Sequence, residues 1–418
     1  MDKFQLFLHT TIRYFIYALA LFPLLPRGVE SVFMISILVL GVIYYVLYQP
    51  KSLNKKKLRQ VIIFGMLFFI YLLTLTYSEN LTRGLKYLKT VLPILIFPVI
   101  FGVFLFGTFS KKQIAPVFNI YLFAVFFYLG FIQGYLYFTK DTATLTDWEY
   151  RNAFETLTDV HGTYFSIWIA FALFIAFFKI EQHIKQKKYF SLVLISGITI
   201  YLIYWQLKIG ARFPQIITVL LLLITFFKKT KKIIYKLVGV MAILFYLVFI
   251  SYVKPNFLVR MKELVNYNFS LPKGDYNYDF ETITNEQIRN GIYFCSLSLI
   301  ESNWLTGYGI GDVDDELQNC YETNLDCNVY VMFNYNSHNQ YFHVFLAAGI
   351  IGLLLFIVSL SVSIYVSYSN SNWLYLLFSL LIFFSLLTEN VLSRHDGVLF
   401  YSFFNAIFAF VGNKCKLL

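Results

Sequence analysis

Long apolar segments alternate with polar ones along almost the whole chain. A helix needs about 20 apolar residues to cross the hydrocarbon core of a bilayer. We therefore predict about twelve membrane spans, at residues 11–25, 31–49, 60–77, 87–107, 114–138, 161–179, 189–207, 211–227, 233–253, 338–366, 371–388 and 397–413. The pattern indicates an all-α polytopic membrane protein, with transmembrane helices 1–9 in residues 1–253 and helices 10–12 in residues 338–418.

Some of these spans are irregular. Pro93 and Pro98 interrupt the fourth span, and the polar segment Lys208 to Arg212 separates the seventh span from the eighth. Residues 18–20, Ala-Leu-Ala, resemble a signal-peptide cleavage site, but the apolar run continues beyond them. We therefore expect an uncleaved first span.

The longest polar segment, residues 254–337, is expected to form a large loop with short helices outside the membrane. Apolar residues recur at helical spacing from Glu286 to Trp304. Asp312 is a suitable N-cap for a second short helix that continues to Tyr321.

The four cysteines lie at scattered positions, which excludes a disulfide scaffold and a paired zinc motif. Cys320 and Cys327 are close together in the large loop, and an oxidising compartment would allow a disulfide between them. Whether they pair is left open by the sequence. Cys295 and Cys415 are expected to be structural.

The distribution of charge predicts the orientation of the spans. Only 14% of the 418 residues are charged, against about 25% in soluble proteins, and the net charge is +11. Most Lys and Arg residues lie in loops on the side of both termini: Lys3, Arg13, residues 51–59, 111–112, 179–188 and 228–236, Lys414 and Lys416. Loops rich in Lys and Arg stay in the cytoplasm, so we expect both termini there and the large loop on the opposite side. The positive charge thus orients the protein, and nucleic acid is not an expected partner.

Basic residues at the outward ends of spans are candidates for anion binding. Lys208 and Arg212 lie at the outward end of the eighth span, and Arg83, Lys86 and Lys89 share one helical face at the start of the fourth. Arg side chains match phosphate oxygens in a bidentate way. The alternative to anion binding at both places is that these side chains only extend from the membrane interface toward the lipid headgroups.

The large loop holds three further features. Arg289 lies in its helical segment, where a solvated position is the simpler interpretation. The Gly-rich turn Gly307-Tyr308-Gly309-Ile310-Gly311 is not a dinucleotide-binding motif, and its glycines predict a tight turn or a close backbone approach to a ligand. The acidic run Asp312 to Glu316 is more typical of a solvated helix start than of an ion site, so we predict no metal and no cofactor.

His338 is the candidate general base, because an imidazole accepts a proton near neutral pH. Ser337-His338-Asn339 stands where the large loop enters the tenth span. His161, at the outward end of the sixth span, is a weaker candidate, and His343, inside the tenth span, is expected to line the same cavity. Simple anchoring at the membrane interface is the alternative for His338.

Three segments resemble the O-antigen ligase and polymerase superfamily of bacterial lipid-linked glycan transferases. SHNQYFHVFLAAGIIGLLLF (337–356) resembles the family's loop ending in His-Asn and the span with Gly-Ile-x-Gly-Leu that follows. NWLTGYGIGD (303–312) resembles the Gly-rich segment before that loop, and KIGARFPQIITVLLL (208–222) resembles an outward Arg followed by a span. ENLTRGLKYLKTVLPILIFP and HGTYFSIWIAF resemble the branch found in Bacteroidetes-type bacteria.

The resemblance implies a GT-C-like membrane glycosyltransferase that works without metal on a glycan linked to undecaprenyl pyrophosphate. Arg212 and Arg289 match the family's two essential arginines, and His338 matches its histidine near the acceptor hydroxyl. Phe213 and Pro214 depart from the small residues that usually follow the first arginine. We thus predict that Arg212, Arg289, Lys208, Arg83 and Lys86 bind pyrophosphate, that His338 is catalytic, and that His161, Tyr308, Asn339 and His343 line the cavity or contact the acceptor.

The predicted function is an O-antigen ligase of lipopolysaccharide biosynthesis, which moves a glycan to lipid A-core or a similar acceptor with inversion. An O-antigen polymerase, which joins carrier-linked repeat units, is the close alternative, and the sequence does not separate the two. A lipid-linked glycan flippase is the alternative of another class, but transporters usually place ionisable groups near mid-membrane and show repeat symmetry. The expected location is the bacterial inner membrane, with the active site in the periplasm.

Overall fold

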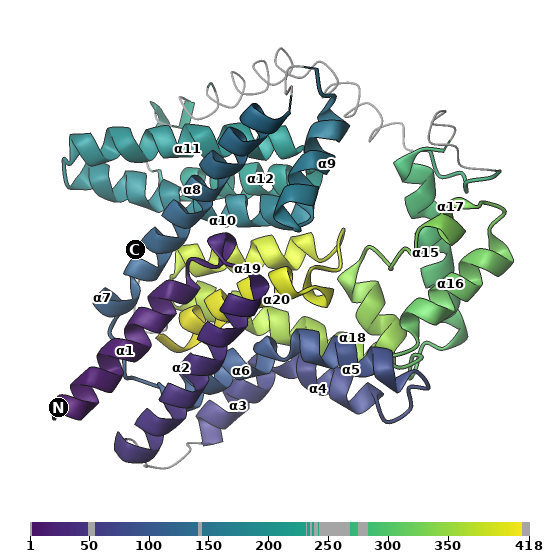
Figure 1. Ribbon diagram of the computed structural model, residues 1–418, viewed down its shortest axis with the longest axis horizontal. Coiled ribbons are helices and arrows are strands. Elements are labelled where there is room, and N and C mark those ends of the chain that lie inside the picture. Colours follow the sequence, from purple (N-terminus) through teal and green to yellow (C-terminus); the bar gives the residue numbers. More distant parts are fainter. Residues whose placement is uncertain are drawn as a thin grey trace.

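The computed structural model describes residues 2–48, 55–140, 144–230, 232–234, 236–237, 241, 268–274 and 283–411. Across these residues the fold is built from helices, which confirms the predicted all-α class (Figure 1). The elements are α1 (Lys3–Leu19), η1 (Phe22–Leu24), α2 (Arg27–Tyr48), α3 (Lys55–Phe64), α4 (Met66–Thr74), α5 (Leu81–Val91), α6 (Pro93–Val99), η2 (Ile100–Phe104), α7 (Lys111–Ile114), α8 (Pro116–Thr139), α9 (Asp147–Thr158), α10 (Gly162–Lys185), α11 (Tyr189–Ile209), α12 (Arg212–Lys229), α15 (Asn285–Ser302), α16 (Val313–Asn324), α17 (Val329–Met332), α18 (Gln340–Ser369), α19 (Trp373–Ser385), η3 (Val391–Ser393), α20 (His395–Ala406) and η4 (Ile407–Val411).

Six helices within the described ranges are long and apolar enough to cross a membrane, and the bent pair α3 and α4 would add a seventh. The second, fifth, sixth and seventh predicted spans correspond to α2, α8, α10 and α11. α19 and α20, at the last two predicted spans, are shorter apolar helices. The predicted span at 233–253 lies almost wholly outside the described residues, as do Cys415 and much of the segment 254–282.

Two predicted spans are divided into shorter helical pieces. The third divides at Gly65 into α3 and α4, and the two helical pieces are bent by 62°. The fourth divides into α5, α6 and η2, with Pro93 at the first position of α6. Proline costs little at that position because its missing N–H would have no partner in a new helical turn. The proline therefore interrupts the helical hydrogen bonding of this segment without ending the segment.

Helix α10 forms the centre of the bundle. It is buried along most of its length and packs against α8, α11, α12 and α19. Phe171 of α10 also contacts α20, with ring centroids 5.7 Å from Phe400 and 4.8 Å from Phe404. Edge-to-face aromatic packing of this kind stabilises the core beyond simple burial. α10 therefore joins the group α8–α12 to the group formed by α1–α6 and α18–α20 (Figure 1).

Helices α15, α16 and α17 form a unit beside the bundle (Figure 1). α15 and α16 agree closely with the two helices predicted for the large loop. Cys320 of α16 forms a disulfide with Cys295 of α15, so its pairing with Cys327 is not the one that forms. The packing of the two helices brings the α-carbons of Cys295 and Cys320 to 5.8 Å, which is within the range a disulfide requires.

The Gly-rich turn packs against a break in α18. Gly349 has a φ of 61° and a ψ of −167°, so the helix is interrupted there. The N–H of Tyr308 donates to Leu346 O at 2.7 Å, and the N–H of Ile350 donates to Trp304 O at 2.9 Å. These bonds replace helical ones that the break removes. The predicted close backbone approach therefore exists, but its partner is the protein's own helix.

Candidate functional site

One buried carboxylate joins two of the side chains selected from the sequence. Oε1 of Glu389 lies 3.4 Å from Nη2 of Arg289, and Oε2 lies 3.4 Å from Nδ1 of His338. Arg289 belongs to α15, His338 to the turn before α18, and Glu389 to the turn between α19 and η3. We call these three residues the Glu389 cluster. It brings together segments that are far apart in the sequence.

A tight turn holds His338 in place. Its φ is 42°, in the left-handed region, and its N–H donates to Oδ1 of Asn336 at 2.9 Å. Asn339 caps α18, because its side chain accepts from the N–H groups of Tyr341 and Phe342 at 2.9 and 3.2 Å. Non-glycine residues adopt this backbone conformation where the surrounding structure fixes them, and such positions are frequent at functional sites. Asn339 is thus engaged as the helix cap beside His338.

The turn that carries Glu389 is fastened to the segment that carries His338. The side chain of Asn390 donates to Oγ of Ser337 at 3.2 Å. The hydroxyl of Tyr164 in α10 donates to Asn390 O at 3.1 Å. α10 and the start of α18 therefore fix the position of the carboxylate relative to the imidazole.

Glu389 is the charged centre of the site, and only 7% of it is exposed. Burial by itself would raise the pKa of Glu389, but His338, His161 and Arg289 together lower this pKa below its ordinary value. The carboxylate therefore stays ionised at neutral pH. It provides a counter-charge for the arginine and for a protonated imidazole.

His161, the N-cap residue of α10, lies in the same electrostatic environment. Burial lowers the pKa of His161, and Glu155 and Glu389 act against that shift while Arg151 and Arg394 add to it. The ring is thus neutral at neutral pH. Its predicted contact with the acceptor stays a prediction.

Lys208 and Arg212 flank the break between α11 and α12. Gly210 occupies the left-handed region there, with a φ of 72°, and Arg212 is the exposed first residue of α12. The ammonium of Lys208 lies 4.2 Å from the centroid of the Tyr150 ring, a cation–π contact. Both cations therefore sit at a helix boundary, as the sequence predicted.

This boundary lies at the same end of the bundle as His161. Ile209 approaches Gly162, the residue that follows His161, so closely that a Cβ on Gly162 would lie 3.1 Å from Cγ2 of Ile209. Arg212 and Arg289 thus reach this end of the molecule from different groups of helices. Their joint action on one diphosphate stays a prediction.

Two other predicted pyrophosphate-binding residues lie on α5. Arg83 forms an ion pair with Asp315 of α16, and the side chain of Asn80 donates to the same carboxylate at 3.1 Å. The charge of Arg83 is therefore balanced within the protein. Lys86 is exposed, and its contact with phosphate stays a prediction.

The acidic run fastens α16 to α5. Asp312 is the N-cap residue of α16, but its carboxylate accepts from the N–H groups of Glu79 and Asn80, at 2.8 Å each. The hydroxyl of Tyr87 donates to Asp314 at 2.8 Å. Over the part of the chain that the structure describes, no group of three or more His, Cys, Asp or Glu side chains is placed to hold a metal ion.

Tyr308 and His343 are packed into the fold. The hydroxyl of Tyr308 donates to a backbone carbonyl of α15 at 3.1 Å. His343 is fully buried, with its ring centroid 5.3 Å from that of Tyr87 and 6.3 Å from that of Tyr71. His343 therefore lies in the protein interior, and the expectation that it lines an open cavity is corrected: the helix turns its side chain inward.

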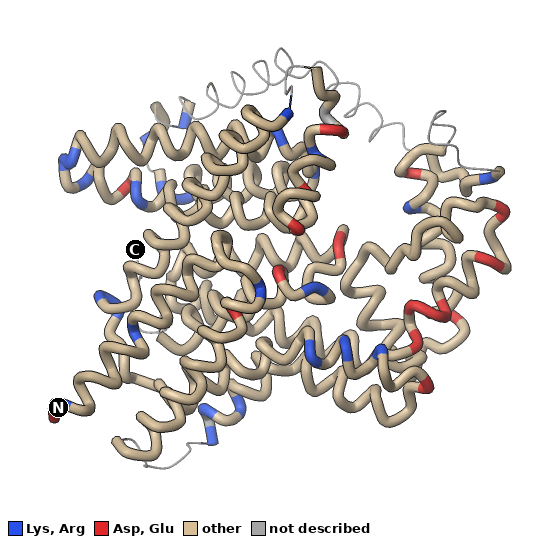
Figure 2. The backbone as a smooth tube through the Cα atoms, in the orientation of Figure 1, with Lys and Arg blue, Asp and Glu red and all other residues tan. Residues whose placement is uncertain are grey.

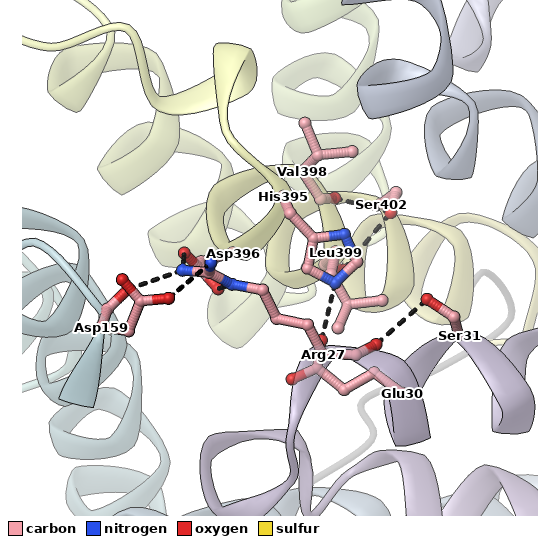
Figure 3. Close-up of polar contacts among 9 residues, drawn as sticks. All are labelled: Arg27, Glu30, Ser31, Asp159, His395, Asp396, Val398, Leu399 and Ser402. Atoms are coloured by element: carbon pink, nitrogen blue, oxygen red, sulfur yellow. Dashed lines mark hydrogen bonds and ion pairs between the residues drawn. The ribbon is translucent and has the colours of Figure 1, made fainter. Parts of the chain in front are cut away.

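A second polar network lies close in sequence to the Glu389 turn (Figure 3). Arg27 at the start of α2 donates to Asp159 at 2.8 Å and to the two carboxylate oxygens of Asp396 at 3.2 and 3.0 Å. Nε2 of His395 lies 2.7 Å from Oε2 of Glu30. We call these five residues the Arg27 network. It connects α2 with the end of α9 and the start of α20.

The sequence analysis did not select Glu389 or the Arg27 network. Both lie in polar interruptions between spans, at residues 26–30, 159, 388–390 and 394–396. Charged side chains at the edge of a membrane are costly unless they are paired. Opposite charges in several of these interruptions were therefore the signal that could have indicated a shared site.

The chemistry available at this site is proton transfer next to a cationic group. Nδ1 of His338 faces a carboxylate, which leaves Nε2 as the nitrogen that can accept a proton. Arg289 presents several N–H donors of fixed geometry, which suit phosphate oxygens. The site thus combines a base and a cation without a candidate covalent nucleophile in the cluster.

A family model described as O-antigen ligase matches residues 192–357. The matched segment includes Arg212, Arg289 and His338, while Glu389 and Arg394 lie beyond its end. No curated protein matches the chain. The likeness of two segments to a Bacteroidetes-type branch stays a prediction.

Proposed function

Because this chain belongs to the superfamily of O-antigen ligases and polymerases, we propose that it moves a glycan from undecaprenyl pyrophosphate to lipid A-core or a similar outer-face acceptor. It is a membrane glycosyltransferase of the ligase or polymerase type. The carrier, the acceptor and the chemical step are our inference from the geometry of the site.

The contact of one carboxylate with both Arg289 and His338 carries this proposal. Glycan transfer from a diphosphate needs a cation for the leaving group and a base for the acceptor hydroxyl. The side chains of Arg289 and His338 are 39% and 23% exposed, whereas that of Glu389 is 9% exposed. A substrate can therefore reach the cation and the base while the carboxylate stays behind them.

In the proposed step, Nε2 of His338 takes the proton of the acceptor hydroxyl. The hydroxyl oxygen bonds to the anomeric carbon of the donor sugar as the bond from that carbon to the diphosphate oxygen breaks. The electron pair leaves with the diphosphate, whose charge Arg289 and Arg212 balance. Glu389 balances the imidazolium that forms. A single displacement of this kind inverts the anomeric configuration.

We infer that the Glu389 cluster faces the periplasm and that both termini face the cytoplasm. Figure 2 supports this orientation, because acidic positions concentrate along α15 and α16, and basic positions at the ends of α11 and α12 that lie farthest from that unit. Loops rich in Lys and Arg stay on the cytoplasmic side of the inner membrane.

The proposal is tested by transfer in vitro with the purified full-length protein and carrier-linked glycan. Lipid A-core and a second carrier-linked glycan are offered separately, each with and without EDTA. Product on lipid A-core supports the ligase, and product only on the carrier-linked acceptor supports the polymerase instead. We expect transfer to survive EDTA, because arginines balance the diphosphate. Donor binding without transfer to either acceptor would remove the enzymatic proposal in favour of a carrier role.

A further inference from the structure

We propose that Arg394 is a third binding residue for phosphate groups of the lipid-linked substrates, and that Arg27 keeps Arg394 available for this task. The inference rests on the proposed function. It concerns residues outside the segment that matches the family model.

Arg394 stands beside both parts of the site. It is the N-cap residue of α20 and follows Glu389 by five positions. His161 and Tyr164, at the start of α10, each interact electrostatically with both Arg394 and Glu389. Tyr164 also donates to the backbone of the Glu389 turn. Arg394 therefore borders the place where the leaving diphosphate of the proposed reaction would lie.

Arg394 differs from four other arginines of the protein in having no ion pair within the described part of the chain. Its side chain is exposed. Arg27, Arg83, Arg151 and Arg289 are each paired with a carboxylate. An exposed guanidinium without a protein counter-charge is suited to bidentate contact with phosphate oxygens. Such a cation is also unexpected on the outward side of a membrane protein, where Lys and Arg are disfavoured near the ends of spans.

The Arg27 network explains why Arg394 stays unpaired. Asp396 lies two positions beyond Arg394, but both of its oxygens accept from Arg27 (Figure 3). Asp159, two positions before His161, is occupied by the same guanidinium. Arg27 thus engages the carboxylates that stand closest in sequence to Arg394 and His161. Its fork of N–H donors can serve two carboxylates at once, which a lysine could not do as well.

Removal of the Arg27 side chain should therefore change the contacts that Arg394 makes. Asp396 is 6% exposed and would be left as a buried carboxylate without a counter-charge. The nearest cation in sequence is Arg394, so we expect an ion pair between the two to form. That pair would take Arg394 away from the substrate.

Binding measurements on the full-length protein in nanodiscs test the role of Arg394. The probes are undecaprenyl diphosphate, undecaprenol, and lipid A with and without its phosphates. We expect Arg394→Gln to weaken binding of undecaprenyl diphosphate about ten- to a hundredfold and to leave undecaprenol binding unchanged. Arg394→Lys should retain part of the affinity. Arg59→Gln, at an exposed arginine of α3, is the matched control.

The binding assay distinguishes a contact with the donor diphosphate from a contact with the phosphates of lipid A. A loss confined to phosphorylated lipid A assigns Arg394 to the acceptor phosphate, which still supports a phosphate-binding role. Unchanged affinity of Arg394→Gln for both phosphorylated probes overturns the proposal. The transfer assay on the unsubstituted protein is separate, so its failure would count against the proposed function and not against phosphate binding by Arg394.

A double variant tests the positioning role of Arg27. Arg27→Ala should weaken binding of undecaprenyl diphosphate as Arg394→Gln does. Arg27→Ala combined with Asp396→Asn should restore most of the affinity, because the amide no longer competes for Arg394. A purely structural role for Arg27 predicts that the double variant binds no better than the single one, and that result would overturn the positioning role.

Discussion

Oε2 of Glu389 lies 3.4 Å from Nδ1 of His338, close enough for an ion pair once the imidazole carries a proton on both nitrogens. The contact orients the imidazole with Nε2 away from the carboxylate. A proton that arrives on Nε2 creates an imidazolium next to a buried negative charge, which stabilises it. In the proposed transfer the carboxylate would balance the imidazolium, and the same carboxylate lies 3.4 Å from Nη2 of Arg289.

The His338→Ala variant should lose glycan transfer activity but should still bind the donor. The variant removes the base but none of the proposed diphosphate contacts, so we expect the transfer rate to fall about 10²- to 10⁴-fold. Initial rates and equilibrium binding of carrier-linked glycan measure the two quantities. His183→Ala, near the other end of α10, is the control and should transfer normally. A wild-type rate for His338→Ala would refute the general-base role.

Glu389→Gln should slow transfer on the order of 10²-fold, because an amide cannot balance the imidazolium. Glu389→Asp keeps the charge and should restore part of the rate. A transfer rate of Glu389→Gln equal to that of the unsubstituted protein would show that Glu389 is only structural.

Arg289→Ala and Arg212→Ala should each weaken donor binding, about tenfold or more, because each removes a charge-assisted contact with the diphosphate. Arg→Lys at either position keeps the charge but loses the bidentate geometry, so intermediate affinity is expected. Equilibrium binding of undecaprenyl diphosphate gives the measurement. Undiminished binding in both alanine variants would remove the proposed clamp.

The sequence predicted the long straight helices well, because lipid requires a locally continuous apolar run with internal backbone hydrogen bonds. α2, α8, α10 and α11 follow from that requirement alone. The bend at Gly65 and the break at Gly349 did not follow, because their backbone conformations depend on neighbouring segments. The Gly-rich turn was recognised as a close approach, but its partner in α18 is a tertiary contact.

The site was predictable only in part, because the sequence reveals local features but not tertiary contacts. His338 stands out locally at the edge of a span, and Arg289 stands out in a helix of the large loop. Glu389 did not stand out, because its role depends on its contact with Arg289, which lies 100 positions away in the sequence. The disulfide could not be predicted from the sequence either, because the packing of α15 against α16, and not nearness in sequence, decides the partner of Cys320.

Gly349→Ala should strongly destabilise the protein. The position has a φ of 61°, and an added Cβ would overlap the carbonyl group of Leu305. A strained backbone costs about 1–3 kcal/mol before the overlap is counted. Gly130→Ala in α8 is the matched control, because nothing lies within 4 Å of its added Cβ and alanine favours a helix. Thermal unfolding in detergent should show a large fall in midpoint for Gly349→Ala, and equal midpoints for both variants would contradict this account of the break.

His161 should make the protein sensitive to mild acid. Burial holds the pKa of His161 below its ordinary value of 6.5, so the folded protein binds fewer protons there than the unfolded chain. The stability that neutral His161 provides is complete above pH 6.5 and is lost as the pH falls toward the lowered pKa. The lowered pKa of Glu389 acts in the same direction, but only below about pH 4.5. His161→Asn removes the titration and keeps an acceptor for the N–H of Thr163. Between about pH 7.5 and 5.5 the unfolding midpoint should therefore fall more steeply for the unsubstituted protein than for the variant, and parallel curves would show that His161 is not the group responsible.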